Sequence, residues 1–135
     1  MPTTFTHDVF GKEVFSRLSE ELKQTIRQGK DLYRIGLHGP DIFFYYHPLV
    51  RGKVYQIGHT MHYEEARGFF ERSAEEYRKH PDPQLASYLL GFGCHFILDS
   101  ECHPYVESFR ALSGVAHMEI EEEFDKKLLR LLGRN

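Results

Sequence analysis

The stretch HFILDSECH, residues 95–103, places two histidines and one aspartate at successive intervals of four residues. Steps of four residues advance a side chain by only about 40° around an α-helix, so His95, Asp99 and His103 form one slowly drifting stripe. The FIL tripeptide beside this stripe is apolar. A polar stripe on the solvent side of a helix ordinarily has polar neighbours, so this stripe does not have the pattern of a solvated face. We therefore expect the stripe to face inward, where buried His and Asp side chains need partners.

Helix signals continue along the chain in both directions from this stretch. Asp82 can cap a helix whose first position is Pro83, and this helix should run through the polar stripe to Pro104. Strand signals are absent. The other predicted helices are a first one bearing Phe10, Val14, Phe15 and Leu18, a second from Ser19 to Gly29, an amphipathic one over residues 57–79, and a last one from Gly114 to Gly133. The sequence thus predicts an all-α fold, with about five or six helices in one compact bundle and one domain spanning residues 1–135.

Composition excludes several classes of function. A net charge of −3 over 135 residues provides no basic field for duplex nucleic acid. The start MPTTFTHDVFGKEVF has no basic region leading into an apolar run, and no stretch approaches the roughly 20 apolar residues of a membrane span. Cys94 and Cys102 would lie two helical turns apart, too far for a disulfide, so we expect free thiols. These features predict a soluble, cytoplasmic protein.

Other histidines repeat the spacing of the polar stripe. His117 and Glu121 stand four residues apart in the last predicted helix, and His59 and His62 stand three apart. His7 and the HGPD segment at residues 38–41 add candidates from the N-terminal part of the chain. Zinc accepts both imidazole nitrogen and carboxylate oxygen, and residues four apart on a helix can deliver two ligands to one ion.

A structural interpretation of these residues stays open. Each His/carboxylate pair alone is a weak signal, because such pairs also occur as surface ion pairs or as hydrogen-bonded core histidines. The triple HxxxDxxxH among apolar residues, together with a second His/carboxylate helix, favours a metal site over a structural polar network.

Three segments carry a resemblance to a known family. HGPD at 38–41, HFILDSECHPYV at 95–106 and HMEIE at 117–121, in that order and after His7, resemble the zinc-dependent phospholipase C family. That family is similar in its metal site to the single-strand-specific zinc nucleases. The resemblance implies an all-helical fold around a buried polynuclear metal cleft in which phosphodiesters are hydrolysed.

The resemblance also implies a set of metal ligands. For a first zinc these are Asp41, His62, His95 and Asp99, with Asp99 bridging to a neighbouring ion, and for a second they are His103, His117 and Glu121. In secreted members an N-terminal Trp, a nearby His and the bridging Asp bind a third ion. Here His7 is the candidate, no Trp is present, and removal of Met1 would leave Pro2 as the terminal amine. We therefore expect two or three Zn²⁺ ions.

The implied activity is that of a zinc-dependent phosphodiesterase acting on phospholipid head groups or a related diester, with transient contact at a membrane surface. Two zinc ions can share a hydroxide, and Asp41 can serve as catalytic base or orienting carboxylate. Tyr45 and Tyr46 are candidate substrate-binding residues, because aromatic faces attract choline-like cations. We expect Phe43 and Phe44 to be core residues instead.

Two other functions stay open at this point. A metal-binding helical domain without turnover could serve as a regulatory or interaction module. A helical HD-type phosphohydrolase is suggested only by the dipeptide His7-Asp8, which has no matching upstream histidine. A turnover assay with and without chelator separates the first of these from the phosphodiesterase.

Overall fold

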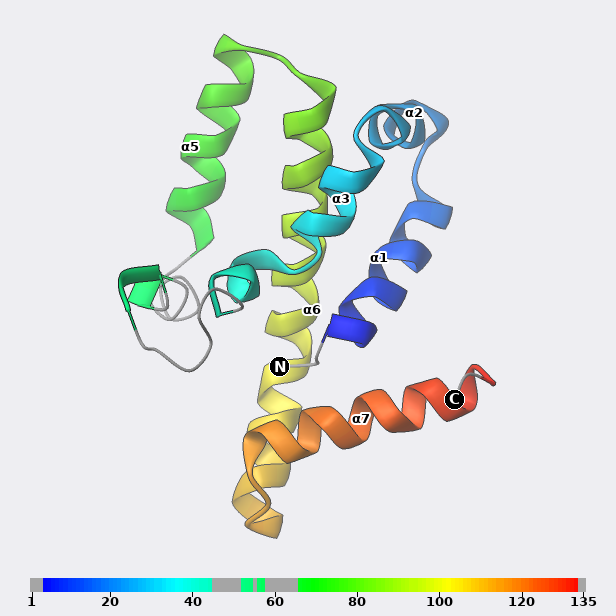
Figure 1. The fold of residues 1–135 in the computed structure, drawn as a ribbon, viewed down its shortest axis with the longest axis vertical. Coiled ribbons are helices and arrows are strands. Elements are labelled where there is room, and N and C mark those ends of the chain that lie inside the picture. The colour runs from blue at the N-terminus through cyan, green and yellow to red at the C-terminus, as the bar shows by residue number, and fades with distance from the viewer. Residues whose placement is uncertain (1–3, 45–51, 55, 58–65, 134–135) are drawn as a thin grey trace.

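The computed structural model describes residues 4–44, 52–54, 56–57 and 66–133, without the side chains of residues 43, 44, 117 and 118. Every element in these ranges is helical, which confirms the all-α prediction (Figure 1). The elements are α1 (Thr4–Arg17), α2 (Glu20–Gln28), α3 (Lys30–Gly36), the 3-10 helix η1 (Gly39–Phe44), α5 (Ala66–Lys79), α6 (Pro83–Ser113) and α7 (His117–Leu131).

Helix α6 is the central element and contacts all the others (Figure 1). The Asp82 side chain accepts a hydrogen bond from the Gln84 amide at 2.9 Å, so the predicted N-cap is confirmed. Gly114 ends the helix in the left-handed conformation, with φ at 70°. The 31 residues between these caps make a rod of roughly 46 Å, long enough to support different neighbours at its two ends.

The prediction that α6 ends at Pro104 is wrong, because the helix continues to Ser113. Proline lacks the N–H that would bond the carbonyl of Ser100 four residues earlier. Both Ser100 and Pro104 are exposed, so water can hydrate that carbonyl and the missing hydrogen bond costs little.

The other predicted boundaries agree with the structure where they can be compared. Ser19 caps α2 by accepting a hydrogen bond from the Leu22 amide at 3.3 Å, and α2 stops before Gly29. The predicted helix over residues 57–79 is described from Ala66 onward, and its first part falls largely outside the described residues. Helix α3 was not recognised in the sequence as a separate element.

Close packing of α3 on α6 depends on two glycines. A Cβ atom on Gly91 would lie 2.2 Å from the Tyr33 carbonyl oxygen, and one on Gly36 would lie 2.3 Å from the Tyr88 carbonyl oxygen. The two backbones therefore approach more closely than any larger residue would allow. The main core forms at this contact, around Ile26, Tyr33, Leu37 and Cys94.

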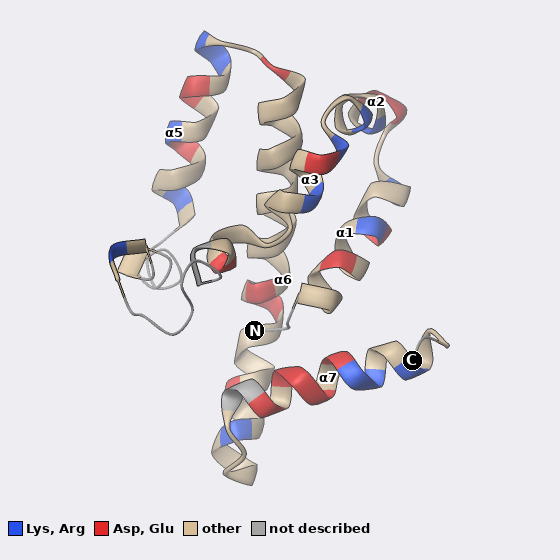
Figure 2. Cartoon of the chain, viewed as in Figure 1, with Lys and Arg blue, Asp and Glu red and all other residues tan. Residues whose placement is uncertain are grey.

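Charges are distributed along α7 in the order that favours a helix. Figure 2 shows acidic residues over its first half and basic residues over its second half. This order complements the helix dipole, whose positive end is the N-terminus. Within the described ranges no helix has the length and apolar character needed to cross a membrane.

Candidate metal centre

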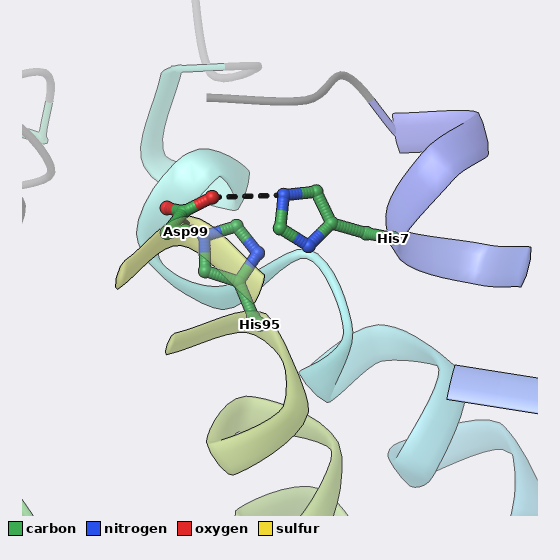
Figure 3. Close-up of side chains that lie close together, drawn as sticks. All are labelled: His7, His95 and Asp99. Atoms are coloured by element: carbon green, nitrogen blue, oxygen red, sulfur yellow. Dashed lines mark ion pairs between the residues drawn. The ribbon is translucent and has the colours of Figure 1, made fainter. Parts of the chain in front are cut away.

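Three polar side chains meet where α1 approaches the middle of α6. Figure 3 shows His7 from α1 beside His95 and Asp99 from α6. Both histidines are only 2% exposed, and their rings stack with centroids 4.0 Å apart. Nε2 of His7 lies 3.0 Å from one Asp99 oxygen, and Nε2 of His95 lies 3.0 Å from the other. The buried group therefore joins two helices that are nearly ninety residues apart in sequence.

The orientation of His95 is set by the chain between α3 and η1. Its Nδ1 atom lies 2.9 Å from the Leu37 carbonyl oxygen, and because a carbonyl can only accept, Nδ1 donates the proton. In neutral imidazole this leaves the Nε2 lone pair directed at Asp99. Gly39 has φ at 53°, and a Cβ there would lie 2.3 Å from the His95 ring. The glycine of HGPD thus allows the chain to pass directly over the imidazole.

The electrostatics of the group follow from burial and pairing. Burial raises the pKa of Asp99, but hydrogen bonds and positive charge from His7 and His95 outweigh it and lower the pKa to about 2. For His95, burial lowers the pKa, while Asp99, Asp41 and the Leu37 carbonyl raise it more, so the net pKa is raised. Without metal, this pairing keeps Asp99 anionic at neutral pH and shifts His95 toward its protonated form.

Two more acidic groups face the same centre. The Asp41 carboxylate in η1 lies 4.0 Å from Nε2 of His95. Burial raises the pKa of Glu121 in α7 to about 8; the charge of the N-terminal amine lowers this pKa, while the charges of Asp99, Asp41 and Asp125 raise it further. A carboxylate in this position is stable at neutral pH only if it is protonated or if a cation neutralises the cluster.

The donor set fits zinc. The metal-binding atoms of His7, His95 and Asp99 all lie within 4.8 Å of one another. Nδ1 of His7 is buried and has no hydrogen-bond partner in the part of the chain that the structure describes. Two imidazoles beside a carboxylate match the nitrogen and oxygen ligands that zinc takes in proteins.

One predicted ligand in the part of the chain that the structure describes, His103, is not brought into this group. His103, the third residue of the stripe, has a side chain that is 55% exposed, and its Nε2 lies 3.9 Å from a Glu107 oxygen. Each step of four residues turns the side chain about 40° around α6 and moves it one turn along the helix. His103 therefore lies beyond the buried region. His62, Tyr45 and Tyr46 lie outside the described residues, as does the His117 side chain.

Both cysteines are free thiols, as predicted. Tyr33 donates a hydrogen bond to the Gly11 carbonyl at 2.6 Å and lies 3.7 Å from the Cys94 sulfur, so Cys94 belongs to the core. Burial raises the pKa of Cys94 and also that of Cys102. Both thiols are therefore protonated at neutral pH in the metal-free protein.

An open cavity of about 690 Å³ lies between α1, α3 and α7. Its lining residues are Thr4, Phe5, Asp8, Asp31, Arg34, Ile35, Leu37, His38 and Asp125. Burial lowers the pKa of His38, and the charges of Asp41, His95 and His7 also act on it. His38, one of the candidates from the HGPD segment, is therefore within electrostatic range of the metal centre while it also lines the cavity.

The helical fold and this donor set are those of an all-α protein with a candidate metal site. Residues 6–133 match the family described as zinc dependent phospholipase C, and the chain belongs to that family. The resemblance inferred from HGPD, HFILDSECHPYV and HMEIE is therefore confirmed, and the family name carries zinc dependence with it. No curated protein and no solved structure gives a significant match.

Proposed function

We propose that the chain is a zinc-dependent phosphodiesterase that hydrolyses phospholipid head-group esters or a related diester. The observation that carries this proposal is the buried meeting of His7, His95 and Asp99, with the carboxylates of Asp41 and Glu121 facing the same centre. Membership of the family supports the reaction class. We include His62, His103 and His117 as further ligands from the sequence pattern, for two or three ions in all.

Asp99 is suited to bridge two ions. Its two oxygens face different histidines, one on α1 and one on α6. The Leu37 carbonyl holds the His95 ring in the tautomer that directs Nε2 at the centre. When bound, zinc supplies a Lewis acid and a hydroxide available at neutral pH.

Asp41 is the candidate base or orienting carboxylate. It directly follows Gly39-Pro40, where the chain crosses the His95 ring, and its side chain is only 13% exposed. A carboxylate held there can accept a proton from a water molecule in the centre or fix that water by hydrogen bonding.

The substrate class follows from the family rather than from a described binding surface. Phospholipids present their phosphodiester at a membrane surface, so activity on them requires transient contact with that surface. Tyr45 and Tyr46 are proposed head-group contacts, because aromatic faces attract quaternary ammonium groups. Two free thiols support a cytoplasmic location.

One observation favours a second function. His7 and His95 are almost fully buried, which is typical of a metal that clamps a fold and is closed to substrate. A non-catalytic metal-binding module is therefore the alternative. It predicts bound zinc without turnover.

The decisive experiment measures metal content and turnover on the same preparation. Protein purified without added metal should contain about two or three zinc ions per chain. It should hydrolyse bis(4-nitrophenyl) phosphate and short-chain phosphatidylcholine, lose both activities on chelation, and regain them with zinc. Asp99→Ala should lose more than one ion and all turnover, while Asp31→Asn, a change in an exposed carboxylate of α3, should keep both. Zinc without turnover would establish the module instead, and absence of zinc would contradict both functions.

A further inference from the structure

The first turn of α1 connects two other helices through consecutive residues. His7 faces Asp99 on α6, while the hydroxyl of the neighbouring Thr6 donates a hydrogen bond to an Asp125 carboxylate oxygen on α7. Consecutive helix positions point about 100° apart, so one turn can reach both partners. Thr6 is only 5% exposed, so its hydroxyl is shielded from competing water.

Helix α7 has little other support at this position. Its main contacts are with α6 and α1, and none of its described side chains is fully buried. Phe124 is 49% exposed and Leu131 is 74% exposed, so apolar packing holds the helix only weakly. The open cavity separates α7 from α3, with Asp125 on its wall. The polar contact between Thr6 and Asp125 is therefore a large part of what orients α7.

Glu121 lies one helical turn before Asp125, and the two side chains share a face of α7. Fixing Asp125 against α1 consequently fixes the direction of Glu121. Oε1 of Glu121 is buried, and the charges of Asp99 and Asp41 act on its carboxyl group, so Glu121 points toward the centre where His7 contacts Asp99. On α1, the residue that contacts α7 (Thr6) is adjacent to the residue at the metal centre (His7). On α7, the corresponding residues, Asp125 and Glu121, lie on successive turns.

We propose that the Thr6–Asp125 hydrogen bond positions Glu121 at the metal centre, so that a ligand on α7 joins those on α1 and α6. This inference rests on the proposed function and adds two positioning residues to it. Neither residue has to touch zinc or substrate. Their effect is on metal affinity through Glu121.

The test compares Thr6→Val with a matched change elsewhere. Valine keeps the shape of threonine and removes the hydroxyl, so Thr6→Val should weaken binding of one zinc by about 10- to 100-fold, measured by competition with a chelating indicator. Thr6→Ser should restore the affinity. Thr25→Val is the control, because the Thr25 hydroxyl donates only to the Glu21 carbonyl within α2, at 3.2 Å.

Two further measurements separate positioning from general damage. Glu121→Ala should cause a similar loss of affinity, and Thr6→Val should add little to it, because both changes remove the same ligand. In metal-free protein, Thr6→Val should speed amide hydrogen exchange in α7 while leaving α3 unchanged. Asp125→Ala breaks the contact from the other helix and should reproduce each result if Thr6→Val fails to fold.

Several outcomes would overturn the inference. These are unchanged zinc affinity in Thr6→Val, an equal loss in Thr25→Val, or full additivity with Glu121→Ala. These outcomes concern only the variants, so they leave the proposed function of the wild-type protein untouched. Failure of the wild-type protein to bind zinc would contradict the proposed function itself.

Discussion

The two halves of α6 differ in how they are covered, although they belong to one continuous helix (Figure 1). All fully buried residues of α6 lie between Ser87 and His95, where α2 and α3 pack against it. Beyond His95, large apolar side chains such as Tyr105, Phe109 and Leu112 are exposed. Stability therefore comes from the first half, and the metal centre lies where tight packing ends.

This boundary explains why the centre needs polar connections. Its α1 and α6 members are held by the well-packed half, but its α7 member is attached to the exposed half. A metal ion would stabilise the molecule most by connecting the two regions.

The largest effect is expected from metal removal. Zinc bound only by the folded arrangement stabilises it by about 4 kcal/mol at a thousandfold excess over the dissociation constant. Chelation should therefore lower the melting temperature markedly, with α7 losing hydrogen-exchange protection before α3. An unchanged melting curve, after loss of metal is confirmed, would show that no ion connects the two regions.

A slightly smaller effect is expected from overpacking the well-covered half. Gly91→Ala forces a Cβ against the Tyr33 backbone and should cost about 3 kcal/mol of unfolding free energy or more. Gly93→Ala is the matched control in the same helix, because nothing lies within 4 Å of its Cβ position, and it should be neutral or stabilising by up to about 1 kcal/mol. Equal denaturant midpoints for the two variants would show that α3 does not pack tightly on the first half of α6, and would contradict the difference between the two halves.

The free energy of unfolding of the metal-free protein should depend on pH through the ionisable groups of the metal centre. The folded pKa of Asp99 is lowered from 3.8 to about 2, so its contribution of about 2 kcal/mol is present above pH 3.8 and lost as the pH falls through 2. The pKa of His95 is raised, so its contribution is present below pH 6.5 and lost as the pH rises through the folded pKa. The folded pKa of Glu121 is also raised, from 4.5 to about 8. Its contribution to the free energy of unfolding is therefore fully present below pH 4.5 and is lost as the pH rises through about 8.

Metal-free protein should consequently be most stable in mildly acidic solution and weaken toward pH 8. Zinc-loaded protein should show a flatter profile near neutrality, because the ion replaces the protons on these groups. Denaturant titrations from pH 3 to pH 9 measure both profiles. Greater stability of the metal-free protein at pH 8 than at pH 5 would contradict the assigned directions.

The smallest effect is expected in the exposed half. Leu112 is 89% exposed near the end of α6, so Leu112→Ala should change the unfolding free energy by less than about 0.5 kcal/mol. Leu37→Ala, which removes a buried leucine, should cost about 2 to 5 kcal/mol. A large loss in Leu112→Ala would mean that this end of α6 is covered in solution, and sedimentation would then test for self-association.

The helix boundaries could be predicted where local chemistry sets them. Ser19 and Asp82 satisfy free amides at helix starts, and Gly114 adopts the left-handed conformation that ends a helix. Pro104 misled the prediction, because the cost of its missing hydrogen bond depends on whether water reaches the Ser100 carbonyl. Exposure of that carbonyl follows from which helices cover α6, and no local pattern contains this information.

The candidate site divides in the same way. His95 and Asp99 could be paired from their spacing alone, because a helix places residues four apart on one face. The Leu37 carbonyl that orients His95 could not be found, because backbone atoms leave no signature in side-chain spacing. Thr6 and Asp125 also carry no motif, and their contact exists only because α1 and α7 meet.

The sequence by itself determined the helical fold class, the family and the pairing of His95 with Asp99, since helical periodicity, caps and motif order are local properties of the chain. Only the tertiary structure decided which candidates share one buried centre. It brought His7 onto Asp99 and left His103 exposed. The physical reason is that burial depends on where α6 loses its cover, and that point depends on the close packing of α3 on α6 at Gly36 and Gly91, one helical turn before the stripe begins.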